Sequence, residues 1–408
     1  MVYIKCIRET TEEGKKSSQE VSGSGVIISP QGELISNWHV ADKAVSLRCL
    51  LYDGQALEAD IVGIDKDIDL ALIKLRRPAD APPLPYAAIG DSTALVEGDF
   101  VMAMGAPWGL SRSVSIGIVS CTRRFLEGQS QYSLWLQTDA AISPGNSGGP
   151  LVNTHGEVIG INTLGTNDGG DMGFAIPSET ISRLLPLLRE HKAVPWSWSG
   201  LQLQALRDFN RNIYFDATEG VIVSGTDPHS PAREAGLQTR DRIVKLNDQP
   251  LNAISEEDLP RVRMTLGLLP RDQAYTLEVV RGTETLKVSV TPREKGRVEG
   301  QELECPRWDL SLKEINQFDN PDLFFHRRQG VYIFGVKQPG NASSAGLNQQ
   351  DILLKVGKEE VGSLDDAKRL HQATLKNVAQ SHRLVLTVLR NGLIRQVALD
   401  ISRDYEKD

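Results

Sequence analysis

Ser147 lies in the stretch "ISPGNSGGPLV" (Ile142–Val152), where glycine, asparagine and proline surround a hydroxyl group. Turns favour these residue types, so a plain glycine-rich turn between two strands is one interpretation. The other is a nucleophile held in a loop lined by backbone amides, since serine can attack a carbonyl when a base activates it. The stretch alone leaves both interpretations open. The choice depends on whether the chain supplies a base and an acid.

A serine nucleophile needs a base to take its proton and a third group to fix the tautomer of that base. The histidines of the N-terminal half are His39, His155 and His191. His155 falls in a predicted hairpin turn, Thr154–Gly156, and His191 follows a predicted helix. His39 ends the apolar strand of "ELISNWHVAD", where a side chain can project into a cleft. It is the candidate base, and a purely structural histidine is the alternative.

The acid must come from the segment "DKDIDLALIKL", which offers Asp65, Asp67 and Asp69. Asp69 stands directly against the apolar run Leu70–Leu75, so it is the aspartate we expect to be drawn into a partly dry site. A buried carboxylate requires a partner, and an imidazole supplies one. Asp69 is therefore the candidate acid.

These residues lie in a region of short apolar runs broken by turn signals, from Val21 to about Pro177. Such a pattern predicts a β-barrel or sandwich. A helix is expected after it, with Ser178 as N-cap and Pro186 kinking the helix or ending it early. The stretch "HKAVPWSWSG" reads as a linker, in which Trp196 and Trp198 either dock on a neighbouring domain or pack locally.

The chain has 408 residues, which predicts about two to four domains. Hydrophobic residues make up 40% and charged residues 24%, as in soluble globular proteins. A formal net charge of −8 argues against a nucleic-acid partner. No apolar run is long enough to form a transmembrane segment. The first residues contain no apolar core of signal-peptide type, so we expect either a cytoplasmic protein or one whose targeting segment has been removed.

The four cysteines are scattered, without a Cys-x-x-Cys pair or a nearby histidine at ligand spacing. This predicts no metal site and no disulfide framework. Buried, unreactive thiols are expected instead. The sequence also contains no Gly-x-x-x-x-Gly-Lys-Ser/Thr loop, and Ser24 and Gly25 precede a strand, which argues against a dinucleotide site. No cofactor is expected.

The second half of the chain contains an internal repeat. "EGVIVSGTDPHSPAREAGLQTRDRIVKLND" begins at Glu219 and "QGVYIFGVKQPGNASSAGLNQQDILLKVGK" begins at Gln329. Gly220 corresponds to Gly330, and Asp241 to Asp351, both 110 residues further on. A period of this length predicts a duplicated domain. Each copy resembles the PDZ domain of bacterial proteases, which binds the free C-terminus of a peptide as an added strand.

The PDZ resemblance implies that the peptide carboxylate is captured by backbone amides at the start of a strand. The residues that it implies for peptide binding are Gly220, Val221 and Ile222 in the first copy and Gly330, Val331 and Tyr332 in the second. Glycine fits such a position because a close backbone approach leaves no room for a Cβ.

The order His39, Asp69, Ser147, with "SNWHV", "DLALIK" and "TDAAISPGNSGGPLVN" around them, resembles the chymotrypsin-like serine proteases. With two PDZ copies attached, the chain is similar to the HtrA/Deg family from Val21 onward. The resemblance implies that Ser147 attacks the peptide carbonyl, His39 transfers the proton and Asp69 orients the imidazole. It also implies an oxyanion hole at Gly145, Asn146 and Ser147.

Digestive relatives carry aspartate before the serine and pair it with a new N-terminal amine. Asn146 is neutral, which predicts activation by loop ordering and not by N-terminal cleavage. The resemblance implies that Thr122–Ser133 relays PDZ occupancy to Ser143–Ser147. It also implies a specificity pocket, without an acidic floor and suited to small aliphatic residues, lined by Ile142, Asn162, Thr163, Leu164 and Gly165.

The sequence thus predicts a mainly β protein: a trypsin-like double barrel followed by two PDZ domains. The expected ranges are a protease domain at 1–190, a linker at 191–199, PDZ domains at 200–294 and 305–404, and a second linker at 295–304. The resemblance implies an ATP-independent endopeptidase acting on unfolded or damaged proteins, as a homotrimer or larger homo-oligomer in the periplasm or cell envelope. A peptide-binding chaperone with minor proteolysis is the alternative.

Overall fold

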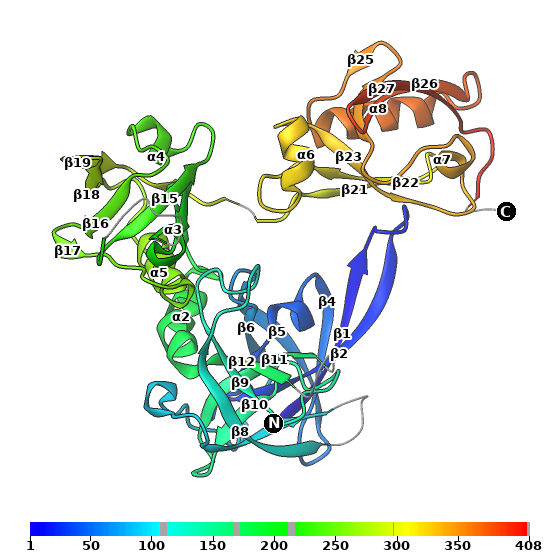
Figure 1. Ribbon diagram of the computed structural model, residues 1–408. Helices are drawn as coiled ribbons and strands as arrows, with labels where there is room; N and C mark the ends of the chain where they lie inside the picture. The colour runs from blue at the N-terminus through cyan, green and yellow to red at the C-terminus, as the bar shows by residue number, and fades with distance from the viewer. Residues whose placement is uncertain (107–111, 167–171, 211–216, 297, 406–408) are drawn as a thin grey trace. The chain divides into compact units, whose positions relative to one another are not determined.

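The N-terminal part of the computed structural model consists of two closed barrels (Figure 1). The structure describes residues 1–106, 112–166, 172–210, 217–296 and 298–405. In the first barrel the strands follow the order β1-β2-β3-β6-β5-β4. Its strands are β1 (Val2–Thr10), β2 (Ser17–Ile27), β3 (Glu33–Ser36), β4 (Ala44–Leu50), β5 (Ala56–Asp65) and β6 (Leu70–Leu75). Along β1, Val2, Ile4 and Cys6 are buried and alternate with more exposed residues, as expected when every second side chain faces a barrel interior.

The second barrel has the strand order β10-β11-β12-β9-β8-β7. Its strands are β7 (Phe100–Gly105), β8 (Ser113–Arg124), β9 (Trp135–Thr138), β10 (Pro150–Asn153), β11 (Val158–Thr166) and β12 (Met172–Pro177). The predicted hairpin joins β10 to β11, with His155 exposed in its turn. The mainly β, double-barrel prediction is confirmed.

Helix α2 (Ser178–His191) follows the second barrel and buries Ile181, Leu184 and Leu188 in the core. One detail of the helix prediction is wrong, and one of the two alternatives for Pro186 is excluded. Pro177 is the N-cap, and Ser178 instead donates its hydroxyl to the carbonyl oxygen of Gly90 at 2.7 Å. Pro186 does not end the helix early, because the buried apolar face carries it on to His191.

The repeat in the second half folds into two sheets with the same strand order. In the first copy β14 (Leu201–Gln204), β15 (Val221–Thr226), β16 (Arg242–Leu246), β18 (Tyr275–Arg281) and β19 (Glu284–Val290) lie side by side. In the second copy the equivalent order is β22 (Leu310–Glu314), β23 (Val331–Val336), β24 (Ile352–Val356), β26 (Arg383–Arg390) and β27 (Leu393–Asp400). Helices α5 (Leu259–Gly267) and α8 (Leu364–Lys376) occupy corresponding places in the chain.

One buried ion pair recurs in both copies and ties the repeat together. Asp241, 1% exposed, accepts two bonds of 2.7 Å from Arg281, and Asp351, fully buried, accepts two of 2.6 Å from Arg390. In each copy the arginine also donates to the carbonyl oxygen of the glycine in the Ala-Gly-Leu turn. The aspartate of the repeat is therefore a structural residue.

The compact units differ from the predicted domain boundaries. The first unit comprises residues 1–6 and 21–295, and the second comprises 7–20 and 296–408. The tip of the β1–β2 hairpin thus packs with the second repeat copy and not with the barrels. The predicted linker 295–304 is also too long, because strand β21 (Glu302–Cys305) belongs to the second sheet.

All four cysteines are free, and Cys6, Cys49 and Cys305 are buried. The expectation of buried thiols is confirmed for these residues, and burial raises the pKa of the Cys49 thiol to about 12 and also raises that of Cys305. Across the described ranges, every helix is too short or too polar to traverse a lipid bilayer.

Candidate active site

His39 and Asp69 form a hydrogen-bonded pair in the first barrel. His39 lies on the short helix α1 (Trp38–Ala41) after β3, and Asp69 immediately precedes β6. His39 Nδ1 lies 3.0 and 2.9 Å from the two carboxylate oxygens of Asp69, whose Oδ1 also accepts the backbone N–H of His39 at 3.0 Å. The carboxylate is 18% exposed and the imidazole 38%. Asp69 therefore fixes the imidazole so that its other nitrogen remains available for proton transfer.

The second barrel supplies Ser147, which a short chain of hydrogen bonds connects to this pair. Ser147 Oγ donates to the carbonyl oxygen of Thr163 at 3.2 Å. Asn37 Nδ2 bridges Thr163 Oγ1, at 2.9 Å, and the carbonyl oxygen of Asp69, at 3.0 Å. The structure thus gathers the three sequence-predicted residues at the junction of the barrels. No hydrogen bond joins His39 to Ser147 within the described part of the chain.

The serine loop owes its shape to its glycines. Gly148 has φ +83°, and a Cβ there would overlap the carbonyl oxygen of Ser24. A Cβ at Gly149 would overlap the carbonyl oxygen of Met104. Both backbones therefore approach neighbouring strands more closely than a side chain permits. The turn and nucleophile interpretations are compatible, because the tight turn presents Ser147.

Some backbone N–H groups of the serine loop donate hydrogen bonds within the described part of the protein, and others do not. The N–H of Asn146 donates to Ser143 at 2.9 Å, and that of Gly148 donates to Asn162 at 2.8 Å. The N–H groups of Gly145 and Ser147 appear in none of the described hydrogen bonds. Gly145 and Ser147 remain the candidate oxyanion donors. The backbone amide of Asn146 does not fit that role, since the turn already uses it.

Ser24 supports the loop from the first barrel, which the sequence analysis missed. Its hydroxyl donates to the carbonyl oxygen of Gly145 at 2.7 Å and accepts the N–H of Ala106 at 2.9 Å. Its own N–H donates to the carbonyl oxygen of Ser147 at 2.8 Å. These bonds hold the residues on either side of Asn146. No local signal in "GSGVII" identifies this role, because the nearest of these partners, Ala106, lies 82 residues away in the sequence.

Asn146 is 4% exposed, and its side chain lies against Gly105 of β7. Its Nδ2 lies 3.5 Å from the carbonyl oxygen of Ala141, and its Oδ1 has no hydrogen-bond partner in the structure. A neutral amide tolerates this environment far better than a carboxylate would. The neutral side chain therefore requires no charged partner in this environment.

The predicted pocket residues play different structural roles. Asn162 is fully buried, and its Nδ2 bonds the carbonyl oxygens of Met104 and Pro150 at 3.2 Å each, so it braces the barrel and does not face a substrate. Gly165 lies against Ile142, whose carbonyl oxygen a Cβ at position 165 would overlap. Ile142, Leu164 and Gly165 are partly or fully exposed and remain candidates for contact with substrate.

A polar network buried beside the site joins the linker to the segment that carries Asp69. Asp65, 6% exposed, accepts Trp196 Nε1 at 2.9 Å and the backbone N–H of Val194 at 3.3 Å. Burial, with a further contribution from the nearby Asp67, raises the pKa of Asp65 to about 7. Trp196 therefore packs on the protease domain, as one of the two interpretations of the linker expected.

The same network reaches the segment Thr122–Ser133. Tyr132 stacks on Trp196 with ring centroids 3.9 Å apart. Lys295, at the end of the first repeat copy, bonds Asp67 Oδ2 at 2.7 Å and Tyr132 OH at 3.3 Å. Every second residue from Asp65 to Asp69 is thus an aspartate, and each has a different partner. Asp65 bonds Trp196, Asp67 bonds Lys295 and Asp69 bonds His39.

The segment Thr122–Ser133 also borders the first repeat copy. A cavity of about 290 Å³ lies between this segment and the ends of β14 and α5, lined among others by Phe125, Gln131, Leu203, Leu259 and Arg263. Arg263 Nη1 lies 3.5 Å from the carbonyl oxygen of Ser130. A ligand lying along β14 and α5 would therefore meet this segment directly.

The prediction that a peptide binds at Gly220–Ile222 and at Gly330–Tyr332 is wrong, because the strands that start at these residues are already paired on both sides. Ile222 of β15 pairs with Gln204 on one side and Arg242 on the other. Tyr332 of β23 likewise pairs with Lys313 and Ile352. Neither strand has a free edge for an added strand, and Gly220 already donates its N–H to Asn252 Oδ1 at 2.7 Å. In the first copy the edge strands of the sheet are β14 and β19, and β14 is the one that neighbours β15.

Comparison with known proteins places this site in context. A trypsin-like peptidase domain model matches residues 23–161, and a PDZ domain model matches residues 222–273. The chain is 31% identical over 395 residues to the probable periplasmic serine endoprotease DegP-like of Chlamydia pneumoniae, covering 95% of this chain and 77% of that protein. The protein of the same name in Pseudomonas fulva is 34% identical over 393 residues, covering 93% and 78%.

A solved structure, the HtrA-type protease AlgW with tripeptide, superimposes with a TM-score of 0.63 at 30% identity, covering 72% of this chain and 94% of that chain. Together, the two barrels, the site and these matches define a trypsin-like serine endopeptidase that carries a PDZ domain. The chain belongs to the HtrA family of DegP-like serine endoproteases.

Proposed function

We propose that this endopeptidase degrades unfolded or damaged proteins without nucleotide, using Ser147 as nucleophile, His39 as general base and Asp69 as the orienting acid. The observation that carries the proposal is the bonded pair of His39 and Asp69 set beside Ser147. Rotation of the Ser147 hydroxyl from Thr163 toward the imidazole would start the reaction. His39 would then take its proton and return it to the leaving amine.

The N–H groups of Gly145 and Ser147 would stabilise the oxyanion, with Ser24 holding the loop in place. Ile142, Leu164 and Gly165 would contact the residue before the cleaved bond. The close contact between Gly165 and Ile142 leaves little depth there, which favours small aliphatic side chains.

Peptide C-termini would bind at β14 of the first PDZ domain. Gly200, with φ +71°, directly precedes this edge strand, which suits capture of a carboxylate by backbone amides. The bound peptide would lie beside the cavity that Thr122–Ser133 lines. Occupancy could then be relayed through Tyr132 and Trp196 to the active-site domain.

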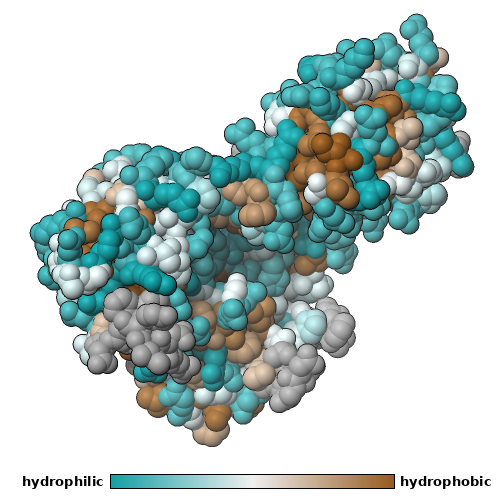
Figure 2. All heavy atoms as spheres, turned by 45° about the horizontal axis from the view of Figure 1, so that its top comes forward, coloured by the Kyte–Doolittle hydropathy of each residue, from teal (hydrophilic) through white to brown (hydrophobic). Residues whose placement is uncertain are grey.

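The names of the relatives support a cellular location for this protein, and its exposed apolar residues support assembly into an oligomer. The relatives named above are described as periplasmic, and we place this chain in the periplasm as well. Phe100, Val114 and Ile116 on the neighbouring strands β7 and β8 are 65%, 56% and 70% exposed, which suits burial between copies of a homo-oligomer. The space-filling view shows apolar areas interspersed among hydrophilic residues (Figure 2).

The proposal is tested by measuring the degradation of a permanently unfolded substrate such as reduced casein. The rate with the unaltered protein is compared with the rate with the Ser147→Ala variant. We expect the variant to lose cleavage completely while it still binds the substrate. Equal cleavage by the variant would refute the assignment. If the variant alone prevented aggregation as well as the active enzyme, a chaperone role would accompany proteolysis.

A further inference from the structure

The two PDZ copies differ at the edge where a peptide would be added. In the first copy β14 pairs with β15 through Leu201 with Thr226 and Gln202 with Gly225, followed by a β-bulge. In the second copy β22 pairs with β23 through Leu310 with Val336 and Ser311 with Gly335, followed by the same bulge. β22 is therefore the structural counterpart of β14.

The outer edge of β22 is occupied by another strand of the same chain. β21 runs antiparallel to β22, from Glu302 opposite Lys313 to Cys305 opposite Leu310. A peptide C-terminus added to a PDZ edge strand runs in this direction, with its last residue at the start of that strand. In the first copy β14 has no such neighbour among the strands of the described ranges. β21 thus fills the place of a ligand.

The residues at the end of β21 are anchored beside α8. Cys305 is fully buried in the same apolar cluster as Ala367 and Leu370 of that helix. The carbonyl oxygen of Pro306, which follows β21, lies 2.8 Å from His371 Nε2. An external peptide would have to displace all of these contacts.

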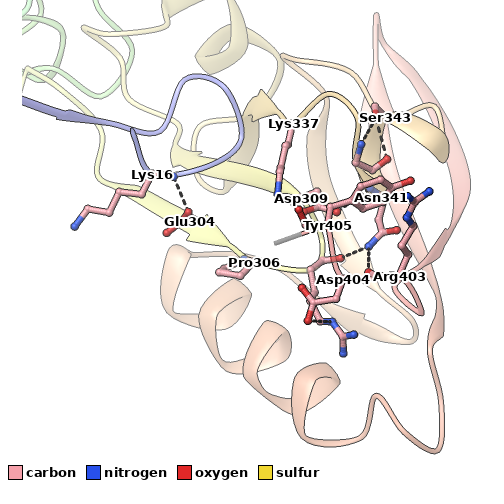
Figure 3. A network of polar contacts seen from close by, with 12 residues as sticks. Lys16, Glu304, Pro306, Asp309, Lys337, Asn341, Ser343, Arg403, Asp404 and Tyr405 are labelled. Atoms are coloured by element: carbon pink, nitrogen blue, oxygen red, sulfur yellow. Dashed lines mark hydrogen bonds and ion pairs between the residues drawn. The ribbon is translucent and has the colours of Figure 1, made fainter. Parts of the chain in front are cut away.

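The residue before β22 differs in kind from the residue before β14. Asp309 precedes β22 as Gly200 precedes β14, and both residues have positive φ, +55° and +71°. The carbonyl oxygen of Asp309 accepts the N–H of Lys337 at 2.9 Å, and that of Gly200 accepts the N–H of Asp227 at 2.8 Å. The Asp309 carboxylate is nearly buried, accepts the N–H of Asn341 at 2.8 Å and pairs with Lys337 Nζ at 3.6 Å (Figure 3). These bonds tie the start of β22 to residues of its own domain.

The tip of the β1–β2 hairpin is bonded to the two glutamate side chains of β21. Thr11 Oγ1 donates to Glu302 Oε2 at 2.7 Å, and the backbone N–H of Lys16 donates to Glu304 Oε1 at 2.5 Å (Figure 3). The carbonyl oxygen of Thr11 also accepts the hydroxyl of Ser311 on β22, at 2.6 Å. A single loop therefore binds both strands of the pair.

We propose that β21 is an internal ligand of the second PDZ domain, latched by the hairpin tip, so that peptide C-termini bind this chain only at β14 of the first PDZ domain. The proposal rests on the peptide-binding role given above for the PDZ domains. It assigns the second domain to internal binding of the chain's own segments.

Amide hydrogen exchange on the full-length Ser147→Ala protein tests this, with a synthetic decapeptide that has a free C-terminus ending in valine as the probe. Without peptide, we expect the amides of β22 to exchange at least tenfold more slowly than those of β14. With peptide, β14 should become protected and β22 should not change. Fast exchange of β22 without peptide, or new protection of β22 with it, would overturn the proposal.

The two proposals fail in different ways. If the peptide protected neither strand, peptide binding by the PDZ domains would be refuted, while the peptide-free comparison of β22 with β14 would still decide whether β21 occupies the edge.

The variant Leu303→Pro provides a second test, because proline removes a backbone donor from β21. Opening of the edge should raise the number of peptides bound per chain from one to two. Arg395→Pro, on the opposite edge strand β27, is the matched control and should leave the number at one. A stoichiometry of one in Leu303→Pro, despite fast exchange of β22, would contradict the proposal. If Leu303→Pro unfolds the domain, the exchange data on the unaltered strand remain decisive.

Discussion

The Ser24 hydroxyl donates to the carbonyl oxygen of Gly145 at 2.7 Å, while the Ser24 N–H donates to the carbonyl oxygen of Ser147 at 2.8 Å. These two bonds come from the first barrel and fix the loop of the second barrel on both sides of the candidate oxyanion donors. Residues of both barrels therefore shape the loop that carries the candidate oxyanion donors.

Replacement of Ser24 by alanine should lower kcat by about 10–100-fold with little change in KM, since a mispositioned oxyanion donor affects the transition state more than substrate binding. The lost hydrogen bonds should also cost about 1–2 kcal/mol in the free energy of unfolding. Steady-state kinetics and urea unfolding would measure both. Ser29→Ala removes a hydroxyl from a surface turn of the same barrel and is the control. An unchanged kcat in Ser24→Ala would contradict the role given to this residue.

The aspartates of the segment before β6 should behave differently. Asp69→Asn should lower kcat by about 10⁴-fold, because the amide no longer favours the required imidazole tautomer. Asp67→Asn should leave kcat within about tenfold of the unaltered enzyme, since Asp67 bonds Lys295 and not His39. Equal losses in the two variants, measured on one short chromogenic peptide, would show that the acid has been misassigned.

Asp65 should make the stability of the chain depend on pH. Its folded-state pKa is about 7 and its ordinary value is 3.8, so the folded state retains a proton that the unfolded state has lost. The contribution of Asp65 is therefore fully present below about pH 4 and is lost as the pH rises toward and through 7. Asp65→Asn should remove this loss of stability. The change that the substitution makes in the free energy of unfolding should therefore be more favourable at pH 8 than at pH 4, by about 1–3 kcal/mol.

Thermal unfolding of both proteins between pH 4 and pH 8 would measure the difference. Asp53→Asn, which changes an exposed turn residue, is the control. Parallel stability curves for Asp65→Asn and the unaltered protein would show that Asp65 titrates normally.

Tyr132 should couple the first PDZ domain to the protease domain. Tyr132→Ala removes the ring that stacks on Trp196, and we expect basal cleavage of a short peptide to persist while stimulation by PDZ-binding peptides falls at least fivefold. Tyr132→Phe keeps the ring and loses only the hydroxyl near Lys295, so most of the stimulation should remain. Full stimulation in Tyr132→Ala would exclude this route.

The sequence was informative where neighbouring residues determine the structure. Ser147 and its glycines, the strand that ends before His39 and the apolar run after Asp69 are local patterns, and the barrels and the repeat could be predicted from such signals. Ser24 could not be identified, because its partner Gly145 lies 121 residues away. Asp65 is buried by Trp196, which lies 131 residues further along the chain.

The peptide-binding edges could not be derived from the repeat for a similar reason. Gly220 and Gly330 mark the start of a strand, but whether that strand has a free edge depends on which distant segments pair with it. β21 has four residues, two of them glutamates, and it lacks the length and apolar content that predict a strand. Its place in the sheet becomes visible only in three dimensions.

The central claim is that His39 and Asp69 activate Ser147. Incubation of the protein with a fluorophosphonate that labels activated serines, followed by peptide mass spectrometry, tests it most directly. We expect one adduct, on Ser147, formed at least a hundredfold more slowly in His39→Ala. Labelling of another serine, or equally fast labelling of Ser147 in His39→Ala, would contradict the claim.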